Sequence, residues 1–259
     1  VTHYFFAREM MNRLPEEAKG VIRKYPKQFI IGNQGPDIFF YHVTSRNFKV
    51  GSHIHKRPFD HLLLLNRHWL QKKPVDSPTW SYFLGLLCHF SLDIAFHPYI
   101  DEIESKISID HITMEREMDR HLLQKAGYDF GEFSEIEAIP HPKYVADDIL
   151  PVYAPYSDIS IHDIRRSLSS FRIAMGFFHV NSKREYRLKK EFLRQMGLSR
   201  SFGGMLMNPD GFFEAERITT PALEERMELA YSVAEDAIKG IYGDEKDFPA
   251  FFHLNFNGQ

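Results

Sequence analysis

The sequence contains almost no cysteine and no excess of basic charge, and each shortage excludes a class of protein. One cysteine among 259 residues rules out an intramolecular disulfide and a cysteine-rich zinc module, and it is typical of a reducing compartment. The formal net charge is −3, which provides no basic surface for a polyanion. We therefore expect no stable complex with nucleic acid.

Long apolar segments are also missing. The longest apolar stretch, residues 82–96, contains two ionisable groups. It is shorter than the roughly 20 residues that cross a bilayer. The start of the chain shows no basic leader followed by an apolar run and a small-residue cleavage site. We therefore expect no transmembrane segment and a cytoplasmic location, or secretion if a leader has been removed.

Several enzyme signatures are absent as well. The sequence has no GxSxG nucleophile elbow, no P-loop, no HExxH and no GxGxxG. Each of these motifs positions the reactive groups of one enzyme class, so those classes are disfavoured. The chemistry must instead be sought among the histidines and carboxylates.

Apolar residues recur at helical spacing in every long segment where a period can be judged, and no comparable stretch alternates apolar and polar residues. Ser77 and Pro78 are typical of a helix start, and so are Thr220 and Pro221 before the last long helix. Pro98 is expected to end the earlier helix because proline lacks the N–H that continues the ladder. The predicted fold is all-α, in a single multi-helix domain.

The predicted domain spans residues 1–259, a length that one core can support. Its candidate metal ligands lie within about residues 1–125, and a helical C-terminal half covers about residues 143–242. The proline-rich segment 128–158 is expected to cross over from one half to the other.

His89, Asp93 and His97 follow one another at steps of four inside the most apolar part of the chain. Residues four apart share one face of a helix, with Cβ atoms about 5–6 Å apart. The three therefore form one polar line that faces an interior or a cleft, where an unpaired carboxylate is costly. Two explanations are open: a structural network centred on Asp93, or three metal ligands with the carboxylate shared by two cations.

A second pair, His111 and Glu115, repeats the four-residue step shortly after His97, at a distance suited to a turn and an antiparallel return. Two helices that each offer an acid and an imidazole to a shared space favour the metal site over two independent networks. Further imidazole and carboxylate donors lie earlier in the chain: His3, Asp37 and His55.

Neutral imidazole and carboxylate are the ligands expected of zinc when no cysteine takes part. Two such ions roughly 3.5–4 Å apart form a centre that hydrolyses phosphate esters, because the metal makes water a stronger acid and stabilises charge on phosphoryl oxygens. The residues therefore favour phosphodiester hydrolysis by metal-activated water.

The segments that carry these donors resemble the zinc-dependent phospholipase C family, whose fold is shared with the single-strand nucleases of the fungal and plant type. The resemblance covers about residues 2–119 and rests on five segments in the family's order. Beyond residue 130 it rests only on helical character and length. The five segments are THYFFA, GPD, HIH, LGLLCHFSLDIAFHPYID and HITMERE.

The resemblance implies a ligand set for each of two zinc ions and a partly shared third. The ligands implied for the first zinc are Asp37, His55, His89 and Asp93. The ligands implied for the second are His97, His111 and Glu115. His3 resembles the family's ligand to a third zinc, which shares Asp93.

The third site departs from the family pattern. In the secreted phospholipases the third ion is also held by the backbone amine and carbonyl of an N-terminal Trp well upstream of the matching histidine. Here Val1 stands only two residues before His3. We therefore expect two zinc ions and a third site that is weak or rearranged. Of the two neighbouring histidines, His55 is preferred over His53 because the family's histidine follows an apolar residue.

The resemblance implies a metal-dependent phosphoric diester hydrolase of the phospholipase C type, with a phospholipid head-group ester as substrate. Asp37 is the candidate to orient or deprotonate the attacking water. Three alternatives stay open: a single-strand nuclease that stacks bases on residues 39–42, a hydrolase of small soluble phosphodiesters, and a non-enzymatic helical interaction protein. Asp119, one turn after Glu115, is predicted either to orient His111 or a ligand water, or to lie on a solvated helix face.

Overall fold

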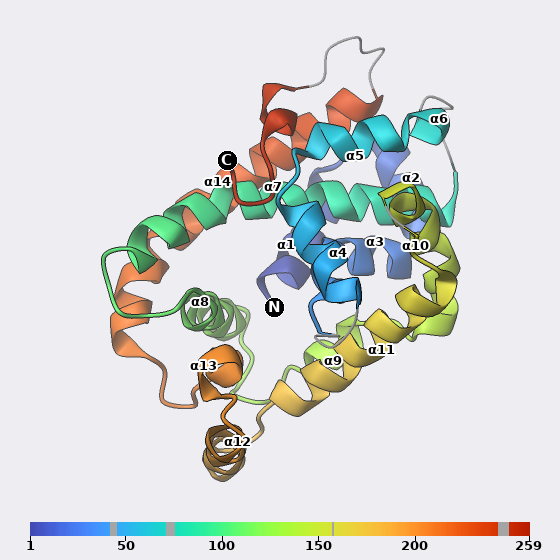
Figure 1. Cartoon of the computed structure of the whole chain (residues 1–259). Coiled ribbons are helices and arrows are strands. Elements are labelled where there is room, and N and C mark those ends of the chain that lie inside the picture. Colours follow the sequence, from blue (N-terminus) through green and yellow to red (C-terminus); the bar gives the residue numbers. More distant parts are fainter. Residues whose placement is uncertain (42–45, 71–75, 157, 243–248) are drawn as a thin grey trace.

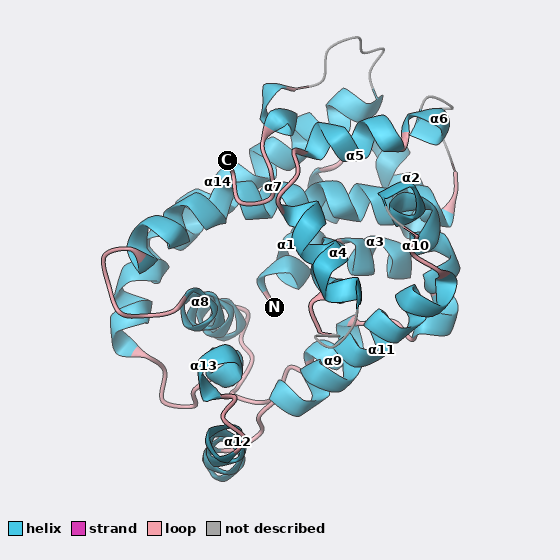
Figure 2. Cartoon of the chain, in the orientation of Figure 1, coloured by secondary structure: helices cyan, strands magenta, loops and turns pink. Residues whose placement is uncertain are grey.

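The computed structural model describes residues 1–41, 46–70, 76–156, 158–242 and 249–259. These residues form helices and turns without a strand, which confirms the predicted all-α fold (Figure 2). The α-helices are α1 Thr2–Arg13, α2 Glu16–Lys24, α3 Pro26–Gly32, α4 Arg46–His55, α5 Phe59–Leu65, α6 Arg67–Leu70, α7 Pro78–Glu104, α8 His111–Lys125, α9 Glu135–Ala138, α10 Ala146–Tyr153, α11 Ile161–Phe178, α12 Lys183–Gln195, α13 Ser199–Phe202 and α14 Phe213–Tyr242. The short 3-10 helices are η1 Gly35–Phe39, η2 Pro142–Tyr144, η3 Ala154–Tyr156, η4 Gly203–Met205 and η5 Ala250–His253.

Helix α7 runs through the middle of the molecule, with α1, α3 and α14 packed against it (Figure 1). Every residue from Trp80 to Asp93 is buried, as expected of a helix that is apolar on all faces. Among the described helices, α7 is long and apolar enough to cross a membrane, yet 78% of its most apolar window is buried inside the protein. Packing within the fold therefore accounts for its apolar character.

The C-terminal segment returns to the middle of the molecule and packs on α7. The ring of Phe59, at the start of α5, stacks on Phe90 of α7 with centroids 4.3 Å apart. Phe252 and Phe256 close the same aromatic cluster, and both are buried. Such ring pairs each contribute about 0.5–1.5 kcal/mol beyond the area that they bury. This cluster brings the backbone of the last residues beside the polar row of α7.

Helices α3 and α7 cross backbone against backbone at two glycines. A Cβ on Gly32 would lie 2.2 Å from the carbonyl oxygen of Tyr82, and a Cβ on Gly85 would lie 2.2 Å from that of Phe29. Neither contact can be relieved by a side-chain rotation because both partners are backbone atoms. The crossing sets the loop after α3 against His89, which lies one turn beyond Gly85.

The prediction that Pro98 ends its helix is wrong. Helix α7 continues through Pro98 to Glu104, and Ser105 N–H donates to the carbonyl of Asp101 beyond the proline. An interior proline removes one donor and costs about 3 kcal/mol. The fully buried Ile100 anchors the following turn to the core, which offsets this cost.

The last long helix also begins earlier than the sequence indicates. Helix α14 starts at Phe213, and Pro221 lies inside it rather than at its first turn. Burial of Ala215 and Thr219 stabilises the turns before the proline. The hydroxyl of Thr219 also donates to the Ala215 carbonyl at 2.9 Å. Tertiary packing thus extends the helix past the local start signal.

Helix α8 does not return antiparallel to α7, contrary to the sequence prediction. In Figure 1, α7 lies across the view, whereas α8 is seen nearly end-on. Asp110 begins α8 by accepting the Thr113 N–H at 3.0 Å. The N-terminal end of α8 approaches the polar row of α7, where His111 and Glu115, one turn apart, lie near His97.

The glycine crossing predicts a large loss of stability in a Gly85→Ala variant. The new Cβ would overlap the Phe29 carbonyl, so we expect a loss of about 3 kcal/mol in the free energy of unfolding. Gly20→Ala in α2 is the matched control because a Cβ there meets no atom within 4 Å. It should stabilise the protein by about 0.5–1 kcal/mol. Urea unfolding of both variants checks the prediction, and equal effects would contradict it.

Candidate metal centre

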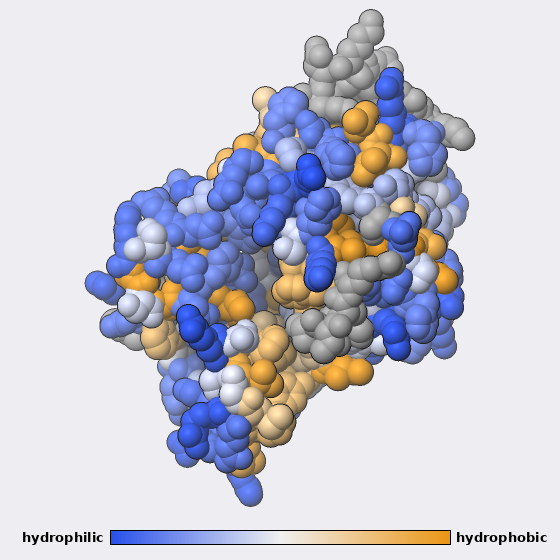
Figure 3. Space-filling model, viewed as in Figure 1, coloured by the Kyte–Doolittle hydropathy of each residue, from blue (hydrophilic) through white to orange (hydrophobic). Residues whose placement is uncertain are grey.

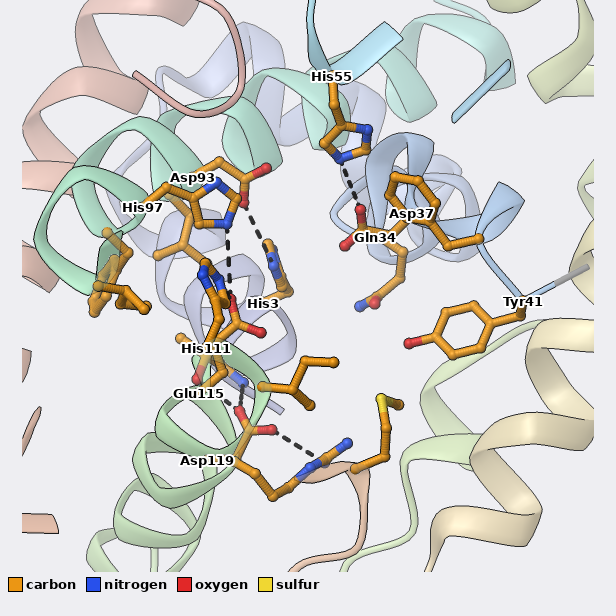
Figure 4. Close-up of a pocket in the computed structure, with 18 of the residues that line it drawn as sticks. His3, Gln34, Asp37, Tyr41, His55, Asp93, His97, His111, Glu115 and Asp119 are labelled. Atoms are coloured by element: carbon orange, nitrogen blue, oxygen red, sulfur yellow. Dashed lines mark hydrogen bonds and ion pairs between the residues drawn. The ribbon is translucent and has the colours of Figure 1, made fainter. Parts of the chain in front are cut away.

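Seven of the eight predicted ligands line one cavity, from α1, η1, α4, α7 and α8 (Figure 4). The eighth, His89, is fully buried behind them, with its ligand atoms close to those of the cavity residues. In Figure 4, His55 and Asp37 face one side of the space, His97, His111 and Glu115 lie on the other, and His3 and Asp93 lie between them. The ligand atoms within each of three groups lie within 4.8 Å of one another. The groups are Asp37, His55 and His89; His3, His89 and Asp93; and His97, His111 and Glu115.

The first group joins the turn after α3 to α4 and α7. Asp37 Oδ1 lies 2.9 Å from Nε2 of His55. His89 completes the group from the middle of α7, where it is fully buried. The structure thus places His55, rather than His53, at the cavity. His53 is exposed, and its ring faces Tyr156 with centroids 6.0 Å apart.

The second group shares His89 with the first. His89 Nε2 lies 3.0 Å from Asp93 Oδ2, and His3 Nε2 lies 3.7 Å from Asp93 Oδ1. The rings of His3 and His89 are stacked with centroids 4.6 Å apart. Each carboxylate oxygen of Asp93 therefore faces a different imidazole, which suits a carboxylate that serves two cations.

The third group lies where α7 meets the first turn of α8. Glu115 Oε1 is 2.9 Å from His111 Nε2 and 3.7 Å from His97 Nε2. His97 is one turn beyond Asp93, so this group adjoins the second. The three groups therefore form a continuous line of acids and imidazoles.

Backbone carbonyls orient three of the imidazoles. Nδ1 of His55 lies 2.9 Å from the Gly51 carbonyl oxygen, and Nδ1 of His97 lies 2.9 Å from that of Phe256. Nδ1 of His89 lies 3.2 Å from the carbonyl oxygen of residue 33. A carbonyl only accepts, so each Nδ1 carries a hydrogen, and Nε2 is the nitrogen left to bind a metal once it is deprotonated. This arrangement is the usual support of metal-binding histidines.

Gly35 lets the chain pass directly over His89. Its φ is +48°, in the left-handed region that favours glycine. A Cβ there would lie 2.2 Å from the His89 ring, so a side chain is excluded for a second reason. The turn from Gly35 then directs Asp37 into the cavity.

The carboxylates of the site are held in their ionised form. Burial raises the pKa of Asp93, but the imidazoles of His89 and His97 outweigh it and hold that pKa far below its usual range. Burial likewise raises the pKa of Glu115, and His111 and His97 more than reverse the effect. These carboxylates are therefore charged at neutral pH, and protonated imidazoles or bound cations must balance them.

The pKa values of two imidazoles in the site are shifted in opposite directions by their surroundings. Burial lowers the pKa of His3 to about 4, and the neighbouring His89 acts in the same direction. Burial also lowers the pKa of His97, but Asp93 and Glu115 outweigh it and raise the pKa to about 10. Without metal, His97 therefore holds a proton across the neutral range, whereas His3 stays uncharged.

One buried atom in this site has no hydrogen bond. Nε2 of His89 lies within 3.0 Å of Asp93, yet its direction does not satisfy a hydrogen bond and no other partner is found among the described residues. An unsatisfied buried nitrogen costs about 1–3 kcal/mol. A cation between the imidazole and the carboxylate would satisfy both atoms. The donor set of imidazole and carboxylate without thiolate also fits zinc.

Asp101 and Glu104 also contact the site, although neither was predicted from the sequence as a site residue. Asp101 Oδ1 lies 3.4 Å from Nδ1 of His111, and Glu104 Oε1 accepts the backbone N–H of His111 at 3.2 Å. Asp101 lies four residues after His97 and so continues the polar row. The signal was present in the spacing, but the helix was expected to end at Pro98.

Asp119 does not lie on a solvated helix face, and no hydrogen bond joins it to His111 among the described residues, whereas a role toward a ligand water stays a prediction. It is buried, and its Oδ1 accepts both the N–H and the hydroxyl of Thr2 at 2.7 Å. Its other oxygen pairs with Arg116 at 3.1 Å. Asp119 therefore fixes the start of α1, next to His3. Of the aromatic segment 39–42, His42 lies outside the described residues.

The cavity has a volume of about 810 Å³ and two unlike walls. The acids and imidazoles form one wall. Apolar side chains from α7, α11 and the α13–η4 segment also line the cavity, including Phe96, Phe171, Met175, Phe202 and Met205. A space of this size falls within the range of small-molecule sites.

His55 and His53 provide a matched test of the ligand set. His55→Ala should lower the zinc content of the purified protein by about one ion per chain, because it removes a donor that faces Asp37. His53→Ala should leave the zinc content unchanged. Elemental analysis of both variants after exhaustive dialysis measures this, and the same zinc content in both would refute the assignment.

Zinc binding should release protons near neutral pH. The His97 pKa of about 10 means that the metal-free protein holds this proton until the pH rises through that value. Zinc needs the neutral imidazole, so it must displace the proton. We expect at least one proton released per chain at pH 7.5, and an affinity that rises about tenfold per pH unit for each proton released. Calorimetry in two buffers of different ionisation enthalpy measures the release, and none would contradict the pairing of His97 with Asp93 and Glu115.

Comparison with known families and proteins supplies an independent finding. A family model described as zinc-dependent phospholipase C matches residues 2–164, which include all eight predicted ligands. No match was found among curated proteins or among solved structures. The matched region covers more than half of the chain and contains α1 to α10. The chain therefore belongs to the zinc-dependent phospholipase C family.

Proposed function

We propose that this protein is a zinc-dependent phosphodiester hydrolase of the phospholipase C type, acting on the head-group phosphodiester of a phospholipid. The observation that carries the proposal is the line of three acid and imidazole groups along one wall of a partly apolar cavity. Membership of the zinc-dependent phospholipase C family supports the same reaction class.

The residues divide into two ligand sets and a shared part. One set combines Asp37, His55, His89 and Asp93, and the other combines His97, His111 and Glu115. His3 adds a donor beside Asp93, as needed for a third ion. Zinc in these sites supplies Lewis acidity, which makes water a stronger acid and stabilises negative charge on the phosphoryl oxygens.

Asp37 is the residue proposed to handle the proton of the attacking water. His55 holds one of its carboxylate oxygens at 2.9 Å, and Figure 4 shows the side chain directed into the cavity near Gln34. Burial raises the pKa of Asp37, but the hydrogen bond from His55 and the nearby His89 lower it overall. The ionised carboxylate orients the water and accepts its proton while the water oxygen bonds to phosphorus. The bond from phosphorus to the leaving oxygen then breaks, and the departing alkoxide takes up a proton from solvent while Asp37 releases the proton it had accepted.

The cavity favours a lipid over a nucleic acid. Its phenylalanine and methionine side chains match an apolar leaving group. Arg116, a cationic residue of the lining, is engaged by Asp119 and Glu135. Lys56 also lines the cavity and forms no ion pair among the described residues, so the lining offers a single unpaired Lys or Arg side chain to a polyanion.

The experiment uses p-nitrophenyl phosphorylcholine as a chromogenic phosphodiester. Chelation should abolish its hydrolysis, and zinc should restore it. Asp37→Asn should reduce kcat by about 10²–10⁴-fold, because the amide cannot accept the proton. Asp60→Asn is the matched control: Asp60 also pairs with a histidine, His253, at 2.7 Å, but does not line the cavity.

The outcomes distinguish the alternatives. Protein that holds no zinc after purification in zinc-replete medium would support a non-enzymatic role and overturn the proposal. A kcat that is unchanged in Asp37→Asn would remove Asp37 from the mechanism. Hydrolysis of single-stranded DNA in preference to the phosphorylcholine ester would favour the nuclease alternative.

A further inference from the structure

Helix α12 carries an exposed apolar stripe at the edge of the molecule (Figure 1). Leu188 and Phe192 lie four residues apart on it, and Met196 follows after four more. Their exposed fractions are 63%, 49% and 59%. Leu193, by contrast, is buried and attaches α12 to the body of the protein. The stripe therefore lies on a face that the fold leaves uncovered.

The stripe continues onto the end of α11. The ring of Phe177 meets that of Phe192 with centroids 5.9 Å apart. Ile173, one turn earlier on α11, is 73% exposed. The two helices thus share one apolar surface, which we term the α11–α12 patch: Ile173, Phe177, Leu188, Phe192 and Met196.

The same helix is strongly basic. Residues 183–195 contain six basic and two acidic residues, a net charge of +4 in a chain whose formal net charge is −3. Ion pairs occupy Lys183, Lys189 and Arg194. Among the described residues, no carboxylate forms an ion pair with Arg184, Arg187 or Lys190. Positive charge therefore flanks the apolar patch.

We propose that the α11–α12 patch docks the protein on the surface of an anionic lipid bilayer. A basic helix with exposed leucine, phenylalanine and methionine suits the interface, where apolar side chains enter the acyl boundary and cations meet acidic head groups. Basic residues near such a surface are attracted by its negative potential. Charge complementarity thus selects the acidic bilayer as the partner.

The position of the patch connects it to the cavity. Ser201 and Phe202 of α13, which follow α12 directly, line the cavity together with Met205. Figure 3 shows apolar residues gathered along the surface between the central hollow and the end of the molecule that carries α12. A bilayer bound at α12 therefore lies next to one wall of the candidate site.

Other occupants satisfy fewer of these features. A nucleic acid would meet the cations but leave the exposed Leu188 and Met196 in water. A second copy stacked through this face would bring two helices of charge +4 together. Only an acidic, partly apolar surface satisfies the apolar stripe and the basic residues at once.

The test is flotation of the zinc-loaded protein with vesicles of phosphatidylcholine alone and with 30% phosphatidylglycerol. A parallel series uses Asp37→Asn, which keeps the vesicles intact. We expect binding only to the acidic vesicles and a loss of most of it in 0.5 M NaCl. The double variant Leu188→Asp, Met196→Asp should reduce binding about tenfold or more.

The matched control is Leu64→Asp on α5, whose side chain has the same exposed fraction as Leu188, 63%. It should bind vesicles as the parent does. In the chain that keeps Asp37, the α12 variants and Leu64→Asp should hydrolyse the soluble phosphorylcholine ester at the parent rate. Arg187→Glu with Lys190→Glu should also abolish binding. Circular dichroism and urea unfolding confirm that each variant is folded.

Four results would overturn the docking proposal: no vesicle binding, equal binding to neutral vesicles, equal loss in Leu64→Asp, or dimerisation through α12 without vesicle binding. The advantage of docking for catalysis rests on the proposed function, but the binding itself does not. Vesicle binding without ester hydrolysis would refute the hydrolase and keep the docking surface. Ester hydrolysis without vesicle binding would refute the docking surface and keep the hydrolase.

Discussion

The buried charge of Asp93 is the constraint on which the rest of the site depends. Its carboxylate is 4% exposed inside an apolar helix, where an isolated charge would cost several kcal/mol. His89 and His3 each face one of its oxygens, and His97 lies one turn further along. Two of these imidazoles lie on the same helix as Asp93, and the fold must bring the third, His3, to the carboxylate from α1. Zinc would relieve the same constraint more fully, because it also satisfies the buried Nε2 of His89.

Two backbone features position the neighbouring parts of the site. The close approach of Gly32 and Gly85 sets α3 on α7, so that the turn at Gly35 passes over His89. The continuation of α7 beyond Pro98 then supplies Asp101, which holds the outer nitrogen of His111. Both features act without contacting a substrate. They define how rigidly the acids and imidazoles are held, and rigid positioning is what a hydrolytic site requires.

The surface chemistry of the protein separates into three parts with different tasks. Acids and imidazoles form one wall of the cavity, apolar side chains face them, and the basic face of α12 lies beyond α13. The proposed substrate, a phospholipid, combines a phosphodiester and apolar chains within a bilayer that has acidic neighbours. Each part of the protein surface therefore matches one feature of that proposed substrate. The overall charge of −3 conceals this arrangement, because α12 carries six basic and only two acidic residues in a chain with a small excess of acids.

Local spacing determined much of what the sequence revealed. The helical period and the four-residue steps of His89, Asp93 and His97 depend only on neighbouring residues, so the all-α fold and the polar row were predictable. The family pattern added His3, Asp37 and His55, although their binding of zinc stays a prediction. Tertiary structure alone decided that α7 passes Pro98 and that α8 crosses rather than returns. It also decided that the Phe256 carbonyl orients His97. These outcomes depend on contacts between residues far apart in the chain, whose packing energy outweighs the local preference and leaves no periodic signal.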